Sequence, residues 1–267
     1  MIELIKQRFT KDMSGEEKLN RTRELLQLTA LKIMYDKDIF KNLAFTGGTA
    51  LRVLFDLRRF SEDLDFSLID KKEYSFKKID SELIRGFKLY GLDMETKPKE
   101  DKTVQSTMLK FPGLLKLIGL SPLAGQKLSI KIEIDTNPPE GGNTNSTIIN
   151  KTYMFNITHF DLPSMFATKL TACFYRKYTK GRDFYDFIWC LGRKIEPNYT
   201  LLNNAIKQTH TKDPGINKDD LKKFLLRNIE KVDFTVVKKD VERFLEDKSE
   251  LKLFELNSIK KTIELIY

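Results

Sequence analysis

The sequence predicts an α+β protein: a mixed β-sheet with flanking helices, followed by a C-terminal helical bundle. Strand-like and helical segments alternate as far as about residue 160, whereas from there to residue 267 the patterned segments have helical spacing alone. A change from mixed to purely helical patterning is typical of an α+β domain joined to a helical one. We therefore expect a sheet-containing domain at 1–160 and a helical domain at 161–267.

The composition indicates a folded, water-soluble chain. Of the 267 residues, 40% are hydrophobic and 32% are charged. No apolar run approaches the roughly 18 residues that would span a bilayer, and the opening residues MIELIKQRF carry charge too early for a signal peptide. We expect a cytoplasmic protein without a membrane partner. The net charge of +9 favours a polyanionic partner such as a nucleic acid.

The first predicted elements surround a pair of glycines. Apolar residues at three- and four-residue spacing predict a helix over 16–35, with Ser14 as its N-cap. The residues LAFTGG, at 43–48, have the pattern of a short buried strand that ends at a glycine corner, and TALRVLFDL then returns to helical spacing. DLDFSLI, at 63–69, alternates charged and apolar residues as a strand does, and a helix is expected over 75–90.

Further strands and then helices complete the chain. KLSIKIEIDTN, at 127–137, is the plainest strand, because its isoleucines point one way and the charged residues between them point the other. NPPEGGNTNS, at 137–146, predicts a loop, and another strand is expected near 153–157. The later segments LPSMFATKLTACFYRKY, GRDFYDFIWCLGRK, DDLKKFLLRNIEKV and VKKDVERFLED all predict helices.

Two pairs of carboxylates occur at strand spacing. Asp63 and Asp65 are two residues apart, so in a strand their side chains share one face at about 6–7 Å. Glu133 and Asp135 repeat this arrangement on a second strand, and if the two strands pair, three or four carboxylates converge. Unpaired acids at this distance oppose folding, whereas Mg²⁺ or Mn²⁺, which prefer oxygen ligands, would remove the conflict. The plainer alternative is ion pairing on an exposed sheet face with Arg58, Arg59 and Lys131.

The glycine pair favours the metal interpretation. Gly47 and Gly48 join a predicted strand to a predicted helix. Glycine lets a phosphate approach the backbone, and the free N–H groups at a helix start attract an anion. The hydroxyls of Thr46 and Thr49 could add donors. Neither a Walker A motif nor a dinucleotide fingerprint is present in the stretch. An anion cradle beside an acidic pair is what handling a nucleoside triphosphate requires.

These motifs resemble the DNA polymerase β-like nucleotidyltransferase superfamily, in which a glycine pair at a strand-to-helix corner precedes a D-x-D pair and a third carboxylate. The blocks GGTALR, RFSEDLDFSL, KIEIDTN, KLTA and GRDFYD lie between about residues 43 and 191. In this order they are similar to the AbiEii/AbiGii family, the toxin components of type IV toxin–antitoxin and abortive-infection systems. The resemblance implies a polymerase β-like fold for the sheet domain.

The resemblance also implies a set of site residues. The nucleotide-binding residues expected from it and from the glycine corner are Thr46, Gly47, Gly48, Thr49 and Lys169. The expected metal ligands are Asp63, Asp65 and Glu133, with Asp135 as the competitor for the third place. The expected catalytic residues are Asp63, Asp65, Glu133, Lys169 and Asp183, and Asp186 belongs to the same acidic motif as Asp183.

The helical motifs can be interpreted from their chemistry as well. Lys169 lies in an otherwise apolar segment, so it either reaches solvent or points into a site. Asp183 and Asp186 are three residues apart on one helical face and could pair with Arg182 or Lys169; a purely structural salt bridge is the alternative. The nearby aromatic residues are expected to lie mostly in the core, although Tyr185 could stack on a base at the rim of the site.

Taken together, the motifs predict transfer of a nucleoside monophosphate from a nucleoside triphosphate to a hydroxyl. The resemblance implies an RNA acceptor such as the 3′ end of tRNA, or a protein, and a cognate antitoxin as partner. One rival is a metal-dependent nuclease, which is disfavoured because Lys131 precedes Glu133, the reverse of the usual E-x-K order. The other is a catalytically degenerate nucleic-acid-binding module, which the intact acidic positions disfavour.

Overall fold

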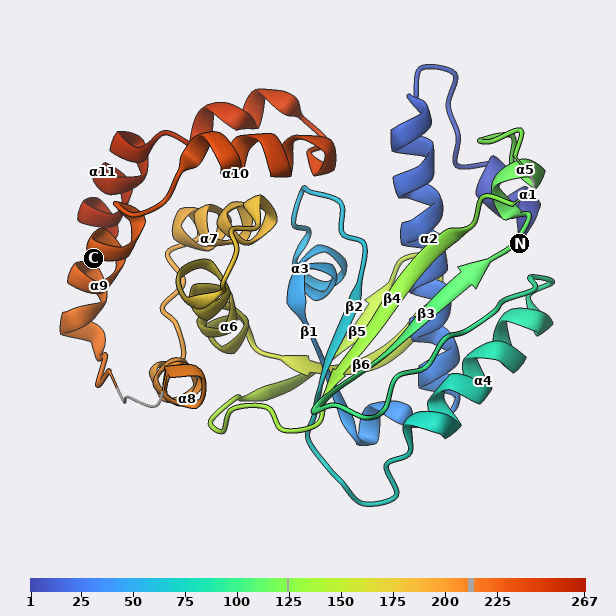
Figure 1. The fold of residues 1–267 in the computed structure, drawn as a ribbon, viewed down its shortest axis with the longest axis horizontal. Coiled ribbons are helices and arrows are strands. Elements are labelled where there is room, and N and C mark those ends of the chain that lie inside the picture. The colour runs from blue at the N-terminus through green and yellow to red at the C-terminus, as the bar shows by residue number, and fades with distance from the viewer. Residues whose placement is uncertain (124, 211–213) are drawn as a thin grey trace. The chain divides into compact units, whose positions relative to one another are not determined.

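The computed structural model describes residues 1–123, 125–210 and 214–267 (Figure 1). Its strands are β1 (Leu43–Thr46), β2 (Leu64–Leu68), β3 (Val104–Phe111), β4 (Leu128–Asp135), β5 (Thr144–Asn150) and β6 (Met154–Phe160). The α-helices are α1 (Ile2–Lys6), α2 (Gly15–Asp36), α3 (Gly47–Phe55), α4 (Phe76–Leu89), α5 (Leu114–Leu117), α6 (Leu162–Tyr175), α7 (Gly181–Gly192), α8 (Tyr199–His210), α9 (Lys218–Ile229), α10 (Phe234–Val241) and α11 (Leu256–Ile266). Short 3₁₀ helices are η1 (Ile39–Lys41), η2 (Glu242–Phe244) and η3 (Lys248–Leu253).

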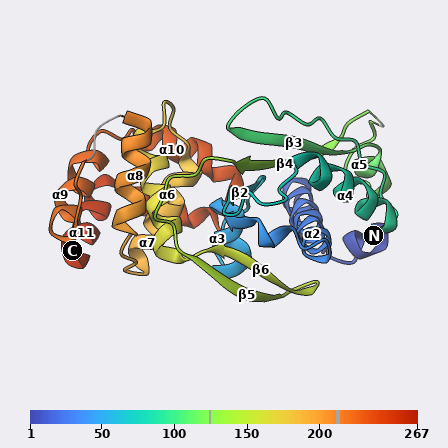
Figure 2. The same cartoon turned by 90° about the horizontal axis from the view of Figure 1, so that it is seen from below.

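The strands form one mixed sheet of six strands in the order β3-β4-β2-β1-β6-β5. β1 and β2 run antiparallel, as do β3 and β4, whereas β2 pairs with β4 in parallel and β1 with β6 in parallel. Figure 2 shows β3 at one edge of this sheet and the β5–β6 pair at the other. The mixed sheet, its flanking helices and the helical C-terminal region confirm the α+β fold class expected from the sequence.

Elements with a clear hydrophobic pattern form where the sequence predicts them. Ser14 caps α2, and its hydroxyl accepts a hydrogen bond from the Glu17 amide at 3.1 Å. On β4, the side chains of Ile130, Ile132 and Ile134 are fully buried, while the residues between them stay partly exposed. α2 and α4 pack against each other (Figure 1). The alternation along β4 therefore turns one sheet face to the core and leaves the other face polar.

The edge strands are where the structure departs from the sequence prediction. β3 was not predicted, and β5 begins at Thr144, inside the expected loop 137–146. Both are edge strands, and most of β5 is exposed on both faces. Because an edge strand pairs with a single neighbour, β5 can form without the apolar alternation by which central strands are recognised. β3, in contrast, buries Leu109 and Phe111 at alternate positions.

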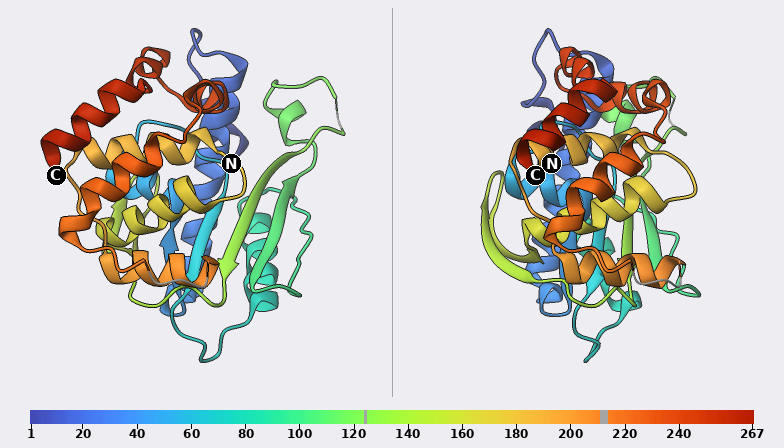
Figure 3. Two further views of the ribbon diagram at one scale, coloured as in Figure 1. Left: turned by 60° about the vertical axis from the view of Figure 1, so that its left-hand side comes forward. Right: turned by 90° about the vertical axis from the view of Figure 1, so that its left-hand side faces the viewer.

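The chain divides into two compact units. Unit 1 comprises 1–54, 60–137 and 146–159, and unit 2 comprises 55–59, 138–145 and 160–267. In unit 2, α6 packs against α7 and α8, α7 against α10, and α9 against α11; these helices run from yellow to red in Figure 3. Within the described ranges, no helix has both the length and the apolar character needed to cross a membrane.

Two short segments within the first 160 residues belong to unit 2, which the expected division at residue 160 does not anticipate. The side chain of Arg59 forms an ion pair with Asp186 on α7. The amide of Asn143 donates a hydrogen bond of 3.0 Å to the Ser164 hydroxyl on α6. Such side-chain contacts join residues more than 20 positions apart, so no local pattern reveals them.

Replacing Ile132 tests whether β4 is central to the core. Ile132→Ala removes a fully buried side chain and is expected to lower the free energy of unfolding by about 2–5 kcal/mol. Ile148→Ala on β5 is the matched control, because that side chain is 66% exposed and its loss is expected to change stability by less than about 0.5 kcal/mol. Urea denaturation measures both, and equal effects would contradict the assignment of β4 to the core.

Candidate active site

The glycine corner at the end of β1 holds one of the predicted carboxylates in place. Gly47 has φ +78°, a conformation that favours glycine. A Cβ atom on Gly47 would lie 2.3 Å from Oδ2 of Asp65, so the carboxylate packs directly against the glycine main chain. Across the antiparallel β1–β2 pair, Asp65 is level with Thr46. The carboxylate of Asp65 therefore lies beside this bend.

Pairing of β2 with β4 brings carboxylates from two strands together. In this parallel pair Asp65 is level with Glu133, and Ser67 is level with Asp135. The carboxylate of Asp135 accepts a hydrogen bond of 3.0 Å from the amide of Asn137, where the strand ends. Burial raises the pKa of Asp135. The register therefore favours Glu133 over Asp135 as the neighbour of Asp65.

Asp63 lies just before β2, and its main chain is tied to the glycine helix. The Thr49 hydroxyl donates a hydrogen bond to the main-chain carbonyl of Asp63, and Thr49 is fully buried. The Thr49 hydroxyl therefore links α3 to the residue before β2 through a hydrogen bond. What this segment offers to an anion are the main-chain N–H groups in the first turn of α3, which have no partners within the helix.

The donor chemistry of this region fits a hard divalent cation. Asp63, Asp65 and Glu133 supply carboxylate oxygens, which are the ligands that Mg²⁺ and Mn²⁺ prefer. The Thr46 hydroxyl, level with Asp65, is buried and has no hydrogen-bond partner within the described part of the chain. Among the described residues, however, no group of three or more metal-ligating side chains is already assembled.

A lysine stands among these carboxylates. Nζ of Lys131 lies 2.6 Å from Oε1 of Glu133 on the same face of β4, and both side chains are about one-third exposed, at 37% and 31%. Partial burial lowers the pKa of Lys131, but the neighbouring carboxylates of Glu133, Asp63 and Asp65 raise it by more. The pKa of Lys131 therefore lies above its ordinary value. The ammonium therefore remains charged and neutralises part of the acidic group.

The predicted residues of the helical domain form a buried network of charges in unit 2. Lys169 on α6 lies 3.0 Å from Asp183 and 2.8 Å from Asp186, both on α7. Arg59 donates two hydrogen bonds to the two oxygens of Asp186, at 2.7 and 2.6 Å. Arg176 donates to the second oxygen of Asp183 at 2.5 Å. Three cations thus surround two carboxylates.

Mutual charge stabilisation keeps this network ionised despite its burial. Arg59 is 2% exposed and Asp186 is inaccessible. Burial lowers the pKa of Lys169, but Asp183 and Asp186 raise it well above its ordinary value. Burial also raises the pKa of Asp183, yet Lys169 and Arg176 hold it below the usual range. Lys169 therefore forms ion pairs with both Asp183 and Asp186, a pairing that the sequence offered as one possibility. The network of three cations and two carboxylates has a net charge of one positive unit.

Two side chains have partners that the sequence did not indicate. The sequence suggests Arg59 as a partner for the carboxylates on the two strands, but it binds Asp186, 127 residues further along the chain. Tyr185 is expected in the core, with stacking on a base as the alternative. It is 6% exposed, and its hydroxyl donates a hydrogen bond of 2.6 Å to Glu250. Its ring is therefore part of the core of unit 2 and is not available for stacking.

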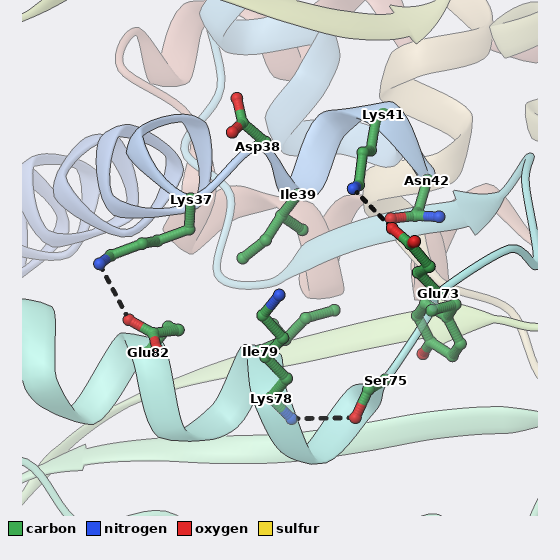
Figure 4. A pocket seen from close by; sticks show the side chains of 11 residues that line it. Lys37, Asp38, Ile39, Lys41, Asn42, Glu73, Ser75, Lys78, Ile79 and Glu82 are labelled. Atoms are coloured by element: carbon green, nitrogen blue, oxygen red, sulfur yellow. Dashed lines mark hydrogen bonds and ion pairs between the residues drawn. The ribbon is translucent and has the colours of Figure 1, made fainter.

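A separate polar hollow lies at the opposite end of β1 (Figure 4). Its charged residues form compensating pairs: Lys37 lies 3.1 Å from Glu82, and Lys41 lies 3.2 Å from Glu73. It adjoins Asn42, before β1, whereas Gly47 follows that strand. The hollow therefore lies at the other end of β1 from Gly47 and Asp65, and its charged side chains compensate one another, so we do not assign it to the candidate active site.

Comparison with known proteins places this geometry in context. A family model described as nucleotidyl transferase AbiEii toxin, type IV TA system, matches residues 30–256. The crystal structure of JHP933 from Helicobacter pylori is 20% identical and superposes with a TM-score of 0.56, over 92% of this chain and 91% of that one. A "putative nucleotidyltransferase from H. pylori" is 21% identical with a TM-score of 0.53, over 92% and 93%. No curated protein sequence matches the chain.

The close approach of Asp65 to Gly47 can be tested by mutation. Gly47→Ala forces a Cβ atom into the Asp65 carboxylate and adopts an unfavourable positive φ. Gly119→Ala is the control, because Gly119 has φ +75° but open space around its Cα atom. Both changes carry the backbone penalty of about 1–2 kcal/mol. We expect Gly47→Ala to lower the free energy of unfolding by clearly more than Gly119→Ala; equal losses in urea denaturation would rule out the contact.

Neighbouring arginines provide a matched pair for the buried network. Arg59→Met removes the two hydrogen bonds that Arg59 donates to Asp186 and leaves Lys169 as the remaining charged partner of that carboxylate; we expect it to lower the free energy of unfolding by about 3–5 kcal/mol. Arg58→Met breaks an ion pair with Glu250 in which the arginine side chain is 62% exposed. We expect this substitution to change the free energy of unfolding by less than about 1 kcal/mol. Thermal or urea unfolding distinguishes them, and a small effect at Arg59 would show that the network contributes little.

Proposed function

Because the chain belongs to the AbiEii nucleotidyltransferase toxin family of type IV toxin–antitoxin systems, we propose that it transfers a nucleoside monophosphate from a nucleoside triphosphate to RNA. Family membership makes the chain a nucleotidyltransferase, in preference to the nuclease and the non-catalytic module. The observation that carries the proposed site is the register of β2 and β4, which sets Asp65 beside Glu133 at the Gly47 corner. The acceptor, the metal and the roles below are our proposal.

Asp63, Asp65 and Glu133 would hold the divalent cation, Mg²⁺ or Mn²⁺. Bound there, the cation would stabilise negative charge on the α-phosphate and make the acceptor hydroxyl more acidic. The Thr46 hydroxyl, which lacks a partner among the described residues, and the main-chain amides at Gly47, Gly48 and Thr49 would donate hydrogen bonds to phosphate oxygens.

The transfer itself is an in-line displacement. The acceptor oxygen forms a bond to the α-phosphorus while the bond from that phosphorus to the bridging oxygen of the β-phosphate breaks, and pyrophosphate leaves. The proton of the acceptor hydroxyl goes to a carboxylate, and Glu133 is the candidate because it is the strand neighbour of Asp65. The residues thus supply a proton acceptor and a fixed position for the phosphate.

Lys169 and Asp183 are proposed to act in the same reaction, as the family resemblance implies. The network that holds them has one more cation than carboxylate, since Arg59, Lys169 and Arg176 face Asp183 and Asp186. A surplus positive charge of this kind supports an interaction with the triphosphate, whose negative charge Lys169 would offset. Asp183 would then orient the ammonium, and Asp186 would anchor it through Arg59.

An RNA acceptor such as the 3′ end of tRNA agrees with the net charge of +9. A protein hydroxyl is the alternative acceptor. Family membership implies a cognate antitoxin, which we expect to be encoded in the neighbouring reading frame, and we propose a cytoplasmic location because RNA and nucleoside triphosphates are available there. Co-purification with the product of that reading frame would identify the antitoxin.

The proposed transfer is tested with α-labelled nucleoside triphosphates. We expect wild-type protein with Mg²⁺ or Mn²⁺ to label total RNA, and Asp65→Asn to lower the rate at least about 100-fold by removing a metal ligand. The control is Asp70→Asn, an exposed aspartate after β2 whose side chain accepts a hydrogen bond from the nearby Lys72 amide. If the label resists ribonuclease and is found in protein, the acceptor is a protein and not RNA. Undiminished transfer by Asp65→Asn would refute the proposed role of Asp65 as a metal ligand.

A further inference from the structure

Lys131 and the three carboxylates form a two-by-two block on one face of the sheet. The parallel register sets Asp65 level with Glu133 and Leu64 level with Ile132. One residue before these come Asp63, which immediately precedes β2, and Lys131 on β4. Because alternate residues share a face and neighbouring strands lie about 4.8 Å apart, these four side chains are adjacent on the same surface. Three positions of the block are acidic and the fourth is a lysine.

The ammonium of Lys131 is bonded to one member of the block. Its Nζ atom lies 2.6 Å from Oε1 of Glu133, a charge-assisted hydrogen bond. The same carboxylate is a proposed ligand of the divalent cation and the proposed proton acceptor. An oxygen that accepts a hydrogen bond from an ammonium at this distance offers less charge to a metal ion. Lys131 and the metal ion therefore compete for Glu133.

We propose that Lys131 is the internal counter-ion of the carboxylate block in the metal-free protein, and that a divalent cation must displace its ammonium from Glu133 in order to bind. This rests on the proposed function, because it takes Asp63, Asp65 and Glu133 as the ligands. The ammonium places a positive charge beside three neighbouring acids and so reduces the repulsion between them.

Displacement leaves Lys131 with a charge and without a partner. The triphosphate that enters with the cation supplies negative oxygens to which the released ammonium can turn. Binding of the cation and binding of the triphosphate are therefore coupled. The cation alone must break the Lys131–Glu133 ion pair, whereas a cation that binds with a triphosphate provides Lys131 with a new negatively charged partner. We infer that nucleotide strengthens metal binding more in the wild type than in a variant without this lysine.

The test measures binding of Mn²⁺ to the full chain, without catalysis, by electron paramagnetic resonance of the free ion. Lys131→Met removes the competitor and is expected to tighten Mn²⁺ binding about tenfold. Lys110→Met is the matched control, because Lys110 lies on the adjacent strand β3, level with Ser129, and has no ion pair with Glu133. It removes the same charge from the same sheet. Lys131→Arg keeps the pair and is expected to bind Mn²⁺ no more tightly than the wild type.

A second readout uses the protein without any metal. In EDTA at low salt, Lys131→Met removes the ammonium that is bonded to Glu133 and is expected to melt at a lower temperature than Lys110→Met. Saturating Mn²⁺ should remove that difference. Tighter Mn²⁺ binding in Lys131→Met than in Lys110→Met supports the proposal, and equal or weaker binding overturns it.

The outcomes separate this inference from the proposed function. If Asp65→Asn binds Mn²⁺ as well as the wild type, the proposed metal site is wrong and the counter-ion exchange falls with it. If binding depends on Asp65 but Lys131→Met behaves as Lys110→Met does, the metal site stands and the exchange alone is refuted. Weaker nucleotide enhancement of Mn²⁺ affinity in Lys131→Met than in the wild type supports the coupling, and equal enhancement refutes it.

Discussion

The parallel pairing of β2 with β4 is the constraint on which the candidate site depends. A strand register is discrete, and a shift of β4 by one residue would turn Glu133 and the polar residues beside it to the core face. The buried isoleucines of β4 oppose such a shift, because they would move into solvent. The same apolar contacts that stabilise the sheet therefore hold two carboxylates side by side, at a bend where only glycine leaves room for Asp65.

Charge is compensated locally in both units. In unit 1, Lys131 lies among carboxylates that would otherwise repel one another. In unit 2, Asp183 and Asp186 accept hydrogen bonds from three cations, and this is what allows the nearly complete burial of these side chains. Each ligand that we propose, cation or phosphate, would therefore exchange one set of charged partners for another. This property suits a site that must be folded before its substrate arrives.

Much of the fold and part of the site could be predicted from local pattern. The central strands and the long helices have strong periodicity, and the glycine corner and acidic pair have spacings with a direct structural meaning. Edge strands β3 and β5 were both missed, and β5 has almost no buried residue by which it could be recognised. The partners of Arg59 and Tyr185, which are Asp186 and Glu250, were missed because they are distant in the sequence.

The sequence by itself determined the class of the protein: the order of its motifs indicates the family, and the alternation along 127–137 indicates which residues face the core. Only the tertiary structure decided that Glu133 neighbours Asp65, that Lys131 binds Glu133, and that Lys169 is shared between two aspartates. The physical reason is that periodicity specifies the face on which a side chain lies, whereas the partner it meets there depends on which strand or helix packs alongside.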